Sequence, residues 1–217
     1  MKKIFISVLC ICIGGFAAAK GWKPLFTPDL SNADRDAKVW SIDAKGVISA
    51  TEDQAIWSMV EYENFELKLE FKTDKCTNSG VLIYCTDKKN WIPNAVEVQI
   101  MDDYCNPSES KASYGSCGSV YGHLAPSEFR LVKKPGEWNK MKITAKGKNI
   151  QVVLNGKKII DMDMKLWTSG SKNPDGSEIP SWLPKPFAEL PTKGFIGFQG
   201  KHGQALIWFR NIKIKEL

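Results

Sequence analysis

Apolar and polar residues alternate along much of the chain. Phe65, Leu67, Leu69 and Phe71 alternate with charged residues, which is the period of a strand with one buried and one solvated face. Similar patterns predict strands at 39–43, 47–50, 56–59, 80–85, 95–101, 138–145, 150–154, 157–161, 194–199 and 205–215. No window of a dozen residues has helical periodicity. The pattern predicts an all-β sandwich, a jelly roll of two antiparallel sheets.

One predicted turn supports this fold, and two long segments lack the strand pattern. Asn155-Gly156 separates two predicted strands and favours a tight hairpin, because both central residues of a type I′ turn need positive φ. The segment 166–193 contains five prolines and is too long for an ordinary structureless loop. A second long polar segment, 102–119, follows the strand that ends at Met101. Both segments are candidates for the walls of one site.

The first 19 residues have the features of a secretory signal peptide. A basic start, Lys2-Lys3, precedes an apolar run, and Ala17-Ala18-Ala19 provides a small-residue cleavage signal before Lys20. Residues 20–217 then form one domain, with a periplasmic or secreted location expected. The remaining chain lacks the 18 or so consecutive apolar residues of a membrane span. The net charge of the whole chain is +6, without a Lys/Arg cluster, so nucleic acid is not an expected partner.

Cleavage would leave four of the six cysteines: Cys76, Cys85, Cys105 and Cys117. In an oxidising compartment they allow three pairings, among which the sequence alone does not choose. Cys76 and Cys85 would meet only across a tight hairpin. Cys105 and Cys117 flank a loop, so we expect this pair if the loop returns on itself. The spacing contains no C-x-x-C zinc motif, and two histidines exclude a three-histidine zinc site.

Residues 97–102 carry the most informative polar side chains. Strand alternation puts Glu97 and Gln99 on one face and Val98 and Ile100 on the other. Asp102 joins Glu97 and Gln99 only if a β-bulge changes its direction, and bulges are frequent beside active sites. Two carboxylates and an amide on one sheet face would suit acid–base chemistry on a sugar. An ordinary solvated strand face is the alternative interpretation.

Glu97-x-Gln99-x-x-Asp102 resembles the E-x-D-x-x-E signature of laminarinase-type jelly-roll glycosidases, with two substitutions. A broader resemblance, from Gly21 to Lys215, is to the 3-keto-disaccharide hydrolase domain family. It rests on Gly21-Trp22, Phe65-Glu66-Leu67, Asn78-Ser79-Gly80-Val81, residues 97–102, Gly136-Glu137-Trp138-Asn139, Leu154-Asn155-Gly156, Gly194-Phe195-Ile196-Gly197-Phe198-Gln199 and Phe209-Arg210-Asn211-Ile212. The resemblance implies a concanavalin-like jelly roll and a part in bacterial glycan breakdown.

The neutral Gln99 is unsuited to a retaining glycosidase mechanism, because it lacks the charge of the laminarinase-type central aspartate. A 3-keto sugar permits another route. Its ketone acidifies the hydrogen on carbon 2, so a base can form an enolate that expels the carbon-1 substituent, and water then adds to the enone. This route needs a base, an acid and donors to the enolate. It needs no nucleotide cofactor, and the chain has no phosphate-binding glycine loop.

Several further residues are candidates, each with a structural alternative. His202 lies in a glycine-flanked turn just after Gln199, and His123 has a similar neighbourhood; either is a catalytic or substrate-binding candidate or a solvated turn residue. Asn78 either bonds a sugar hydroxyl or shapes its turn. Arg210 shares strand phase with large apolar residues, which predicts a substrate contact or a buried salt bridge to an acid such as Glu97 or Glu66.

Loop tryptophans provide a second clue to the ligand, because apolar sugar faces stack on flat aromatic rings. Three lie in loop-like polar segments, and we expect at least one to line a sugar cleft: Trp91, Trp167 and Trp182. The candidate catalytic residues are then Glu97, Asp102 and His202, without a metal. The leading hypothesis is an exported enzyme that cleaves glycosidic bonds of 3-keto-disaccharides or ordinary glycosides. The alternative is a noncatalytic carbohydrate-binding module, since jelly rolls serve both roles.

Overall fold

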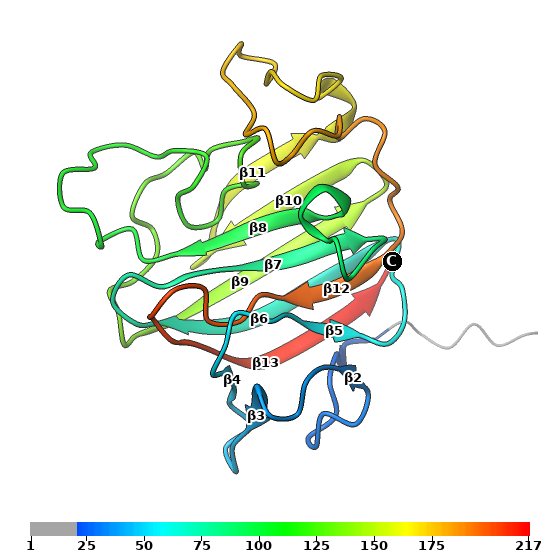
Figure 1. Ribbon diagram of the computed structural model, residues 1–217, viewed down its shortest axis with the longest axis vertical. Coiled ribbons are helices and arrows are strands. Elements are labelled where there is room, and N and C mark those ends of the chain that lie inside the picture. Colours follow the sequence, from blue (N-terminus) through cyan, green and yellow to red (C-terminus); the bar gives the residue numbers. More distant parts are fainter. Residues whose placement is uncertain (1–20) are drawn as a thin grey trace, which may run out of the picture.

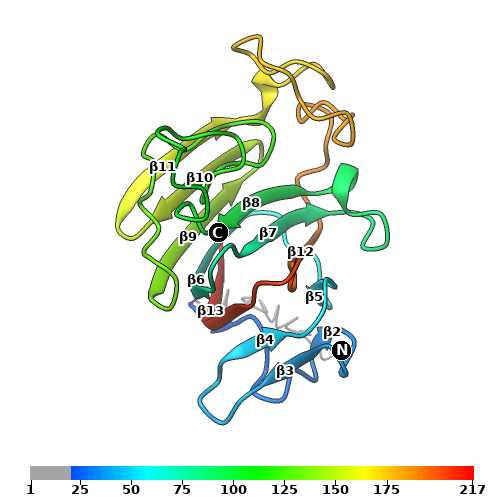
Figure 2. The same ribbon diagram turned by 60° about the vertical axis from the view of Figure 1, so that its left-hand side comes forward.

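The computed structural model describes residues 21–217, which form two antiparallel β-sheets packed face to face (Figures 1 and 2). The predicted signal peptide, 1–19, lies outside the described residues. The larger sheet has eight strands in the order β11-β10-β9-β6-β13-β4-β3, with β1 paired to β13. The smaller sheet has five, in the order β2-β5-β12-β7-β8. The prediction of an all-β jelly-roll sandwich is confirmed.

Every strand expected from the alternation forms within a few residues of its predicted bounds. The larger sheet contains β1 (Lys23–Pro24), β3 (Trp40–Ile42), β4 (Ile48–Ala50), β6 (Phe65–Thr73), β9 (Trp138–Lys146), β10 (Asn149–Leu154), β11 (Lys157–Asp163) and β13 (Ile207–Glu216). The smaller contains β2 (Ala33–Asp34), β5 (Ile56–Ser58), β7 (Asn78–Cys85), β8 (Val96–Met101) and β12 (Phe195–Phe198). Two short 3-10 helices, η1 (Ile92–Asn94) and η2 (Met164–Leu166), complete the described elements.

The core lies between the sheets and is built from the inward residues of the alternating strands. Phe65, Leu67, Leu69 and Phe71 of β6 are buried, as their period predicts. Phe198 of β12 meets Phe209 of β13 edge to face across the sandwich, with ring centroids 5.1 Å apart. The Asn155-Gly156 turn joins β10 to β11 with φ of 48° and 90°, which confirms the expected hairpin.

The long segment 166–193 packs onto one end of the sandwich (Figure 1). Ile179, Leu183, Phe187 and Leu190 are buried in the main hydrophobic cluster, so the segment is held by side-chain packing despite its lack of regular strands. Among residues 21–217, no helix is long and apolar enough to span a membrane.

The disulfide joins Cys76 to Cys105, so the expected Cys105–Cys117 pairing is wrong. Cys117 is instead a free thiol buried in the core, and its backbone amide donates to Asp103 Oδ1 at 2.8 Å. Cys85, also free, ends β7. The disulfide ties the β6–β7 connection to the 102–119 segment, a long-range contact that spacing along the chain does not reveal.

We expect removal of this disulfide to lower the free energy of unfolding by about 3 to 4 kcal/mol. The reason is that the bridge joins residues 29 positions apart and so restricts the unfolded chain. Urea denaturation of the Cys76→Ser/Cys105→Ser double variant measures this loss. A reductant should destabilise the wild-type protein to the same extent and leave the variant unchanged, since Cys85 and Cys117 are already thiols. Equal stability of variant and wild type would contradict the expectation.

Candidate active site

A cleft of about 270 Å³ lies on the outer face of the five-stranded sheet. Its floor comes from the strands β7 and β8, and its sides come from loops. The lining residues are Asn78, Trp91, Ile92, Glu97, Gln99, Tyr121, Trp182, Leu183, Gln199 and His202. The cleft therefore brings together most of the site residues expected from the sequence.

Glu97 is the second residue of β8 and lies directly opposite Leu82 of β7. Leu82 is fully buried in a small apolar cluster that also contains Trp57 and Ala95. Burial and the negative charge of Asp53 raise the pKa of the Glu97 carboxyl from its ordinary 4.5 to about 8. At neutral pH this carboxyl is thus mainly protonated and able to donate a proton.

Gly80 provides the space for this carboxyl. A Cβ atom added at Gly80 would lie 2.1 Å from Glu97 Oε1, far inside van der Waals contact. Gly80 sits on β7 opposite Gln99, and its carbonyl oxygen accepts from the backbone N–H of Gln199 at 2.9 Å. The neighbouring strand is therefore shaped around the Glu97 side chain.

We expect Gly80→Ala to lower turnover by about 100-fold, because a displacement of roughly 1 Å in a catalytic group has that effect. The variant keeps its backbone conformation, since Gly80 does not have positive φ. Gly115→Ala is the matched control, as its nearest neighbour would be 3.9 Å from the new Cβ. Steady-state kinetics on both variants make the comparison, and unchanged turnover in Gly80→Ala would show that the position of Glu97 is unimportant.

His202 and Asp53 form a pair at the edge of the cleft. His202 Nδ1 lies 2.5 Å from Asp53 Oδ2, and Gln199 Nε2 donates to Asp53 Oδ1 at 3.3 Å. In a neutral imidazole with Nδ1–H donated to Asp53, Nε2 holds the lone pair and can act as a base. The side chains are about half exposed, at 51% for His202 and 43% for Asp53. The pair thus combines an oriented base with access to a ligand.

The amides on the floor form a second polar group. Gln99 Nε2 donates to Asn78 Oδ1 at 2.8 Å, which leaves the Asn78 amide nitrogen to donate elsewhere. Residues 78 and 202 also form an isolated antiparallel bridge, so Asn78 and His202 are adjacent. Both amides are therefore placed to donate hydrogen bonds to oxygen atoms of a ligand in the cleft.

Two of the three loop tryptophans line the cleft. Trp91 precedes η1 and is half-buried, whereas Trp182 comes from the 166–193 segment and is 56% exposed. Trp167 is buried instead, and its Nε1–H donates to Asn173 Oδ1 at 2.9 Å. Of the two segments expected as walls, 166–193 contributes Trp182 and Leu183, while 102–119 contributes no lining residue.

Asp102 does not join Glu97 and Gln99. The β7–β8 pairing runs without a bulge, so Asp102 keeps the inward phase of Val98 and Ile100. Its carboxylate is buried and accepts hydrogen bonds from the backbone amides of Cys76 at 2.9 Å and Tyr104 at 3.1 Å. Asp102 therefore holds two loops together, and the bulge on which its catalytic assignment depended is absent.

Arg210 lies on the opposite sheet and does not reach the cleft. Its expected phase was wrong because β13 shifts register between Arg210 and Lys213, around Asn211 with φ of 54°. Arg210 consequently points outward, and its Nε donates to Glu70 Oε2 at 2.7 Å rather than to Glu97 or Glu66. Its guanidinium also lies 4.0 Å from the centroid of the Trp138 ring.

His123 is buried in the core rather than exposed in the cleft. Its ring stacks on Phe187 with centroids 3.6 Å apart, and Nδ1 donates to the Tyr121 carbonyl oxygen at 2.8 Å. Burial lowers the pKa of His123 to about 4, so its ring is neutral under ordinary conditions. This residue supports the loop that carries Tyr121.

Asp53 is the functional candidate that the sequence did not indicate. It is one of two exposed acids in the loop between β4 and β5, with no motif around it. Its contact with His202 spans 149 residues of sequence. Among residues 21–217, no cluster of three or more His, Cys, Asp or Glu side chains has a metal-binding arrangement.

Residues 20–215 match the 3-keto-alpha-glucoside-1,2-lyase-like domain family. This chain belongs to that family. A 3-keto-disaccharide hydrolase of Bacteroides thetaiotaomicron is 29% identical over 178 residues, which cover 72% of this chain and 60% of that protein. The chain thus spans less than two thirds of that relative's length.

Two solved structures have a fold similar to that of this chain. A candidate glycosyl hydrolase of Parabacteroides distasonis is 62% identical, with a TM-score of 0.88 over 91% of this chain and 100% of that one. A carbohydrate-binding module of Bacillus subtilis has a TM-score of 0.52 at 11% identity, over 92% of this chain and 98% of that one. The second similarity concerns the fold alone.

Proposed function

We propose that this protein is a glycosidase-like enzyme that cleaves the glycosidic bond of 3-keto-disaccharides and related 3-keto-glycosides by elimination and hydration. The proposal rests on the geometry of the cleft, which is lined both by Glu97, whose carboxyl has a raised pKa, and by His202, which is paired with Asp53. An acid and an oriented base in one cleft are what this route requires. Family membership and the name of the Bacteroides relative support the substrate class.

The first half-reaction is an elimination. His202 Nε2 removes the hydrogen from carbon 2, and the electrons pass into the ketone as an enolate. The Asn78 and Gln99 amides donate hydrogen bonds to the sugar oxygens that gain charge. The enolate then expels the carbon-1 substituent, whose oxygen takes the proton from Glu97. The departing alcohol is neutral, and the sugar is left with a double bond between carbons 1 and 2.

The second half-reaction reverses the proton transfers with water in place of the alcohol. Glu97, now a carboxylate, accepts a proton from water as its oxygen bonds to carbon 1. The protonated His202, whose half-exposed ring exchanges its acidic proton with the solvent, then delivers a solvent-derived proton to carbon 2. The net result is the addition of one water across the glycosidic bond, and both residues regain their starting states.

The pH dependence of kcat/KM follows from the pKa of Glu97. The active form of Glu97 is the protonated one, and its pKa is about 8, so the rate should fall about tenfold per pH unit above pH 8. A Glu97→Gln variant should lose this alkaline limb. Initial rates between pH 6 and 10 measure the effect. A rate that keeps rising through pH 9 would contradict Glu97 as the proton donor.

A panel of glycosides tests the proposed activity. The purified protein is incubated with a 3-keto-disaccharide and its unmodified counterpart, and products are followed by chromatography. We expect cleavage of the 3-keto sugar, because only the ketone acidifies carbon 2. Calorimetric binding of unchanged sugar, with no cleavage of any glycoside by folded protein, would instead favour a carbohydrate-binding module.

We also propose that the protein works in the periplasm or outside the cell. The support is the signal-like pattern of residues 1–19 and the Cys76–Cys105 disulfide, because disulfides persist mainly in oxidising compartments. N-terminal sequencing of the protein from fractionated cells provides the test. An intact Met1 in a cytoplasmic fraction would contradict export.

A further inference from the structure

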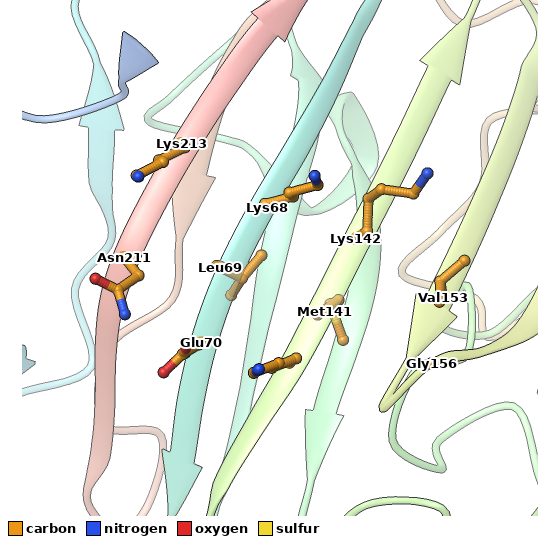
Figure 3. Close-up of a pocket in the computed structure, with 10 residues that line it drawn as sticks. Lys68, Leu69, Glu70, Met141, Lys142, Val153, Gly156, Asn211 and Lys213 are labelled. Atoms are coloured by element: carbon orange, nitrogen blue, oxygen red, sulfur yellow. The ribbon is translucent and has the colours of Figure 1, made fainter. Parts of the chain in front are cut away.

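The outer face of the larger sheet, opposite the cleft, carries an unusual row of lysines. Three neighbouring strands, β13, β6 and β9, align Lys213 with Lys68 and Lys68 with Lys142. Figure 3 shows these three side chains next to one another on adjacent strands. Since paired strands lie about 5 Å apart, three positive charges occupy a width of roughly 10 Å.

The rows on either side have a different composition. One aligns Lys215 with Glu66 and Glu66 with Thr144, and the other aligns Arg210 with Glu70 and Glu70 with Lys140. Each has a glutamate on the central strand β6, and Glu70 accepts from Arg210 at 2.7 Å. Of these three rows, the one centred on Lys68 alone has a cation on β6 and cations on both neighbouring strands.

The lysine row is only partly neutralised by the chain. Lys142 Nζ lies 3.1 Å from Glu66, but within residues 21–217 neither Lys68 nor Lys213 has an ion pair. Lys68 Nζ instead lies over the Trp22 ring, 4.1 Å from its centroid. Like charges directly opposite each other destabilise a sheet. An anionic ligand over this row would offset that repulsion.

The row lines a hollow rather than a flat surface. The hollow has a volume of about 580 Å³ and also contains Glu70, Lys140 and Asn211. A second hollow, of about 450 Å³, shares Asn211 and Lys213 with it. Most of its lining is apolar, with Phe26 and Ile212 among the residues, and Asp43 and Arg210 also lie there. The two together form a trough with a cationic part and an apolar part.

We propose that this trough binds an acidic polysaccharide, with sugar carboxylates over the lysine row and apolar sugar faces in the adjoining hollow. A chain with repeated negative charges fits three cations in line better than a single small anion does. A lipid bilayer fits less well, because the large exposed apolar residues of the described chain do not line this trough. Single-stranded nucleic acid would need free aromatic rings, whereas Trp22 and Trp138 are covered by Lys68 and Arg210.

Calorimetric titration of the full chain with a hexameric oligogalacturonate tests the proposal, with maltohexaose as the neutral control. We expect the acidic oligomer alone to bind at this trough, with an affinity that falls as salt is added. Lys68→Glu puts a glutamate at the centre of the row, as in the two neighbouring rows. It should weaken binding about tenfold, because it replaces an attraction to the ligand by a repulsion. The change should not unfold the protein, since it removes a like-charge contact.

Lys111→Glu is the matched control, because Lys111 is exposed and lies in the 102–119 segment, away from the trough. It alters net charge equally and should leave oligogalacturonate affinity within about twofold of the wild type. Cleavage of 3-keto-glycosides should be unchanged in both variants, so this proposal is tested separately from the cleft. Equal loss in both variants, no binding by the wild type, or tighter binding to single-stranded DNA or phosphatidylglycerol vesicles would overturn it.

Discussion

Glu97→Gln should fold normally, retain affinity for the 3-keto-glycoside and lose about 100- to 10,000-fold in turnover. The amide keeps the shape and hydrogen-bonding reach of the carboxyl but removes its transferable proton. Because Gly80 leaves space for this side chain, the substitution should cause no steric conflict. Single-turnover kinetics with calorimetric binding separate the chemical step from affinity. Near-full turnover would make Glu97 a wall residue only.

The stability of the same variant provides an independent check. Glu97 has an ordinary pKa of 4.5 in the unfolded chain and about 8 in the folded one, so between these pH values the folded state holds the extra proton. The stabilisation that Glu97 contributes is therefore complete below pH 4.5 and is lost as the pH rises through 8. Urea denaturation from pH 5 to 9 should show this loss in wild type and not in Glu97→Gln. The exposed-residue control Glu189→Gln should follow the wild type.

His202→Gln should also lower turnover by about 100- to 10,000-fold, because the proposed base is removed. The His202 side chain is half exposed, so the thermal midpoint should change little. Asp53→Asn should cause a smaller loss, since the imidazole remains but loses the carboxylate that orients it. Kinetics and thermal melts on both variants give the result.

The second histidine of the chain provides the contrast. His123 is buried and stacked on Phe187, so His123→Ala should lower the thermal midpoint while the folded fraction keeps its turnover. If His202→Gln instead melts early and His123→Ala abolishes turnover in folded protein, the roles assigned to the two residues are reversed.

The strands were predictable from the sequence because burial of one sheet face imposes a period of two. Phe65 to Phe71 shows this clearly, and so does the outward direction of Glu97 and Gln99 on β8. These features depend on local alternation alone. The tight turn at Asn155-Gly156 was predictable for a related reason, since its positive φ values are a local requirement.

The errors came from features that local alternation does not determine. The bulge on which the assignment of Asp102 depended is absent from β8, so Asp102 stays inward. An unexpected register shift near Asn211 instead separates Arg210, which points outward, from Ile212 and Ile214, which point inward. The Cys76–Cys105 bridge and the His202–Asp53 pair join segments far apart in sequence. Such contacts follow from the packing of the sandwich, which composition and spacing do not specify.

We propose above that the glycosidic bond breaks by elimination through carbon 2, with Glu97 and His202 as acid and base. The most direct measurement is NMR of the sugar released from a 3-keto-disaccharide in D₂O, with authentic product in the same buffer as a control for spontaneous exchange. Elimination should place one deuterium at carbon 2 of the 3-keto product, and this label should form faster than it does by exchange in the control. Cleavage that leaves hydrogen at carbon 2 would indicate direct hydrolysis and contradict the elimination mechanism.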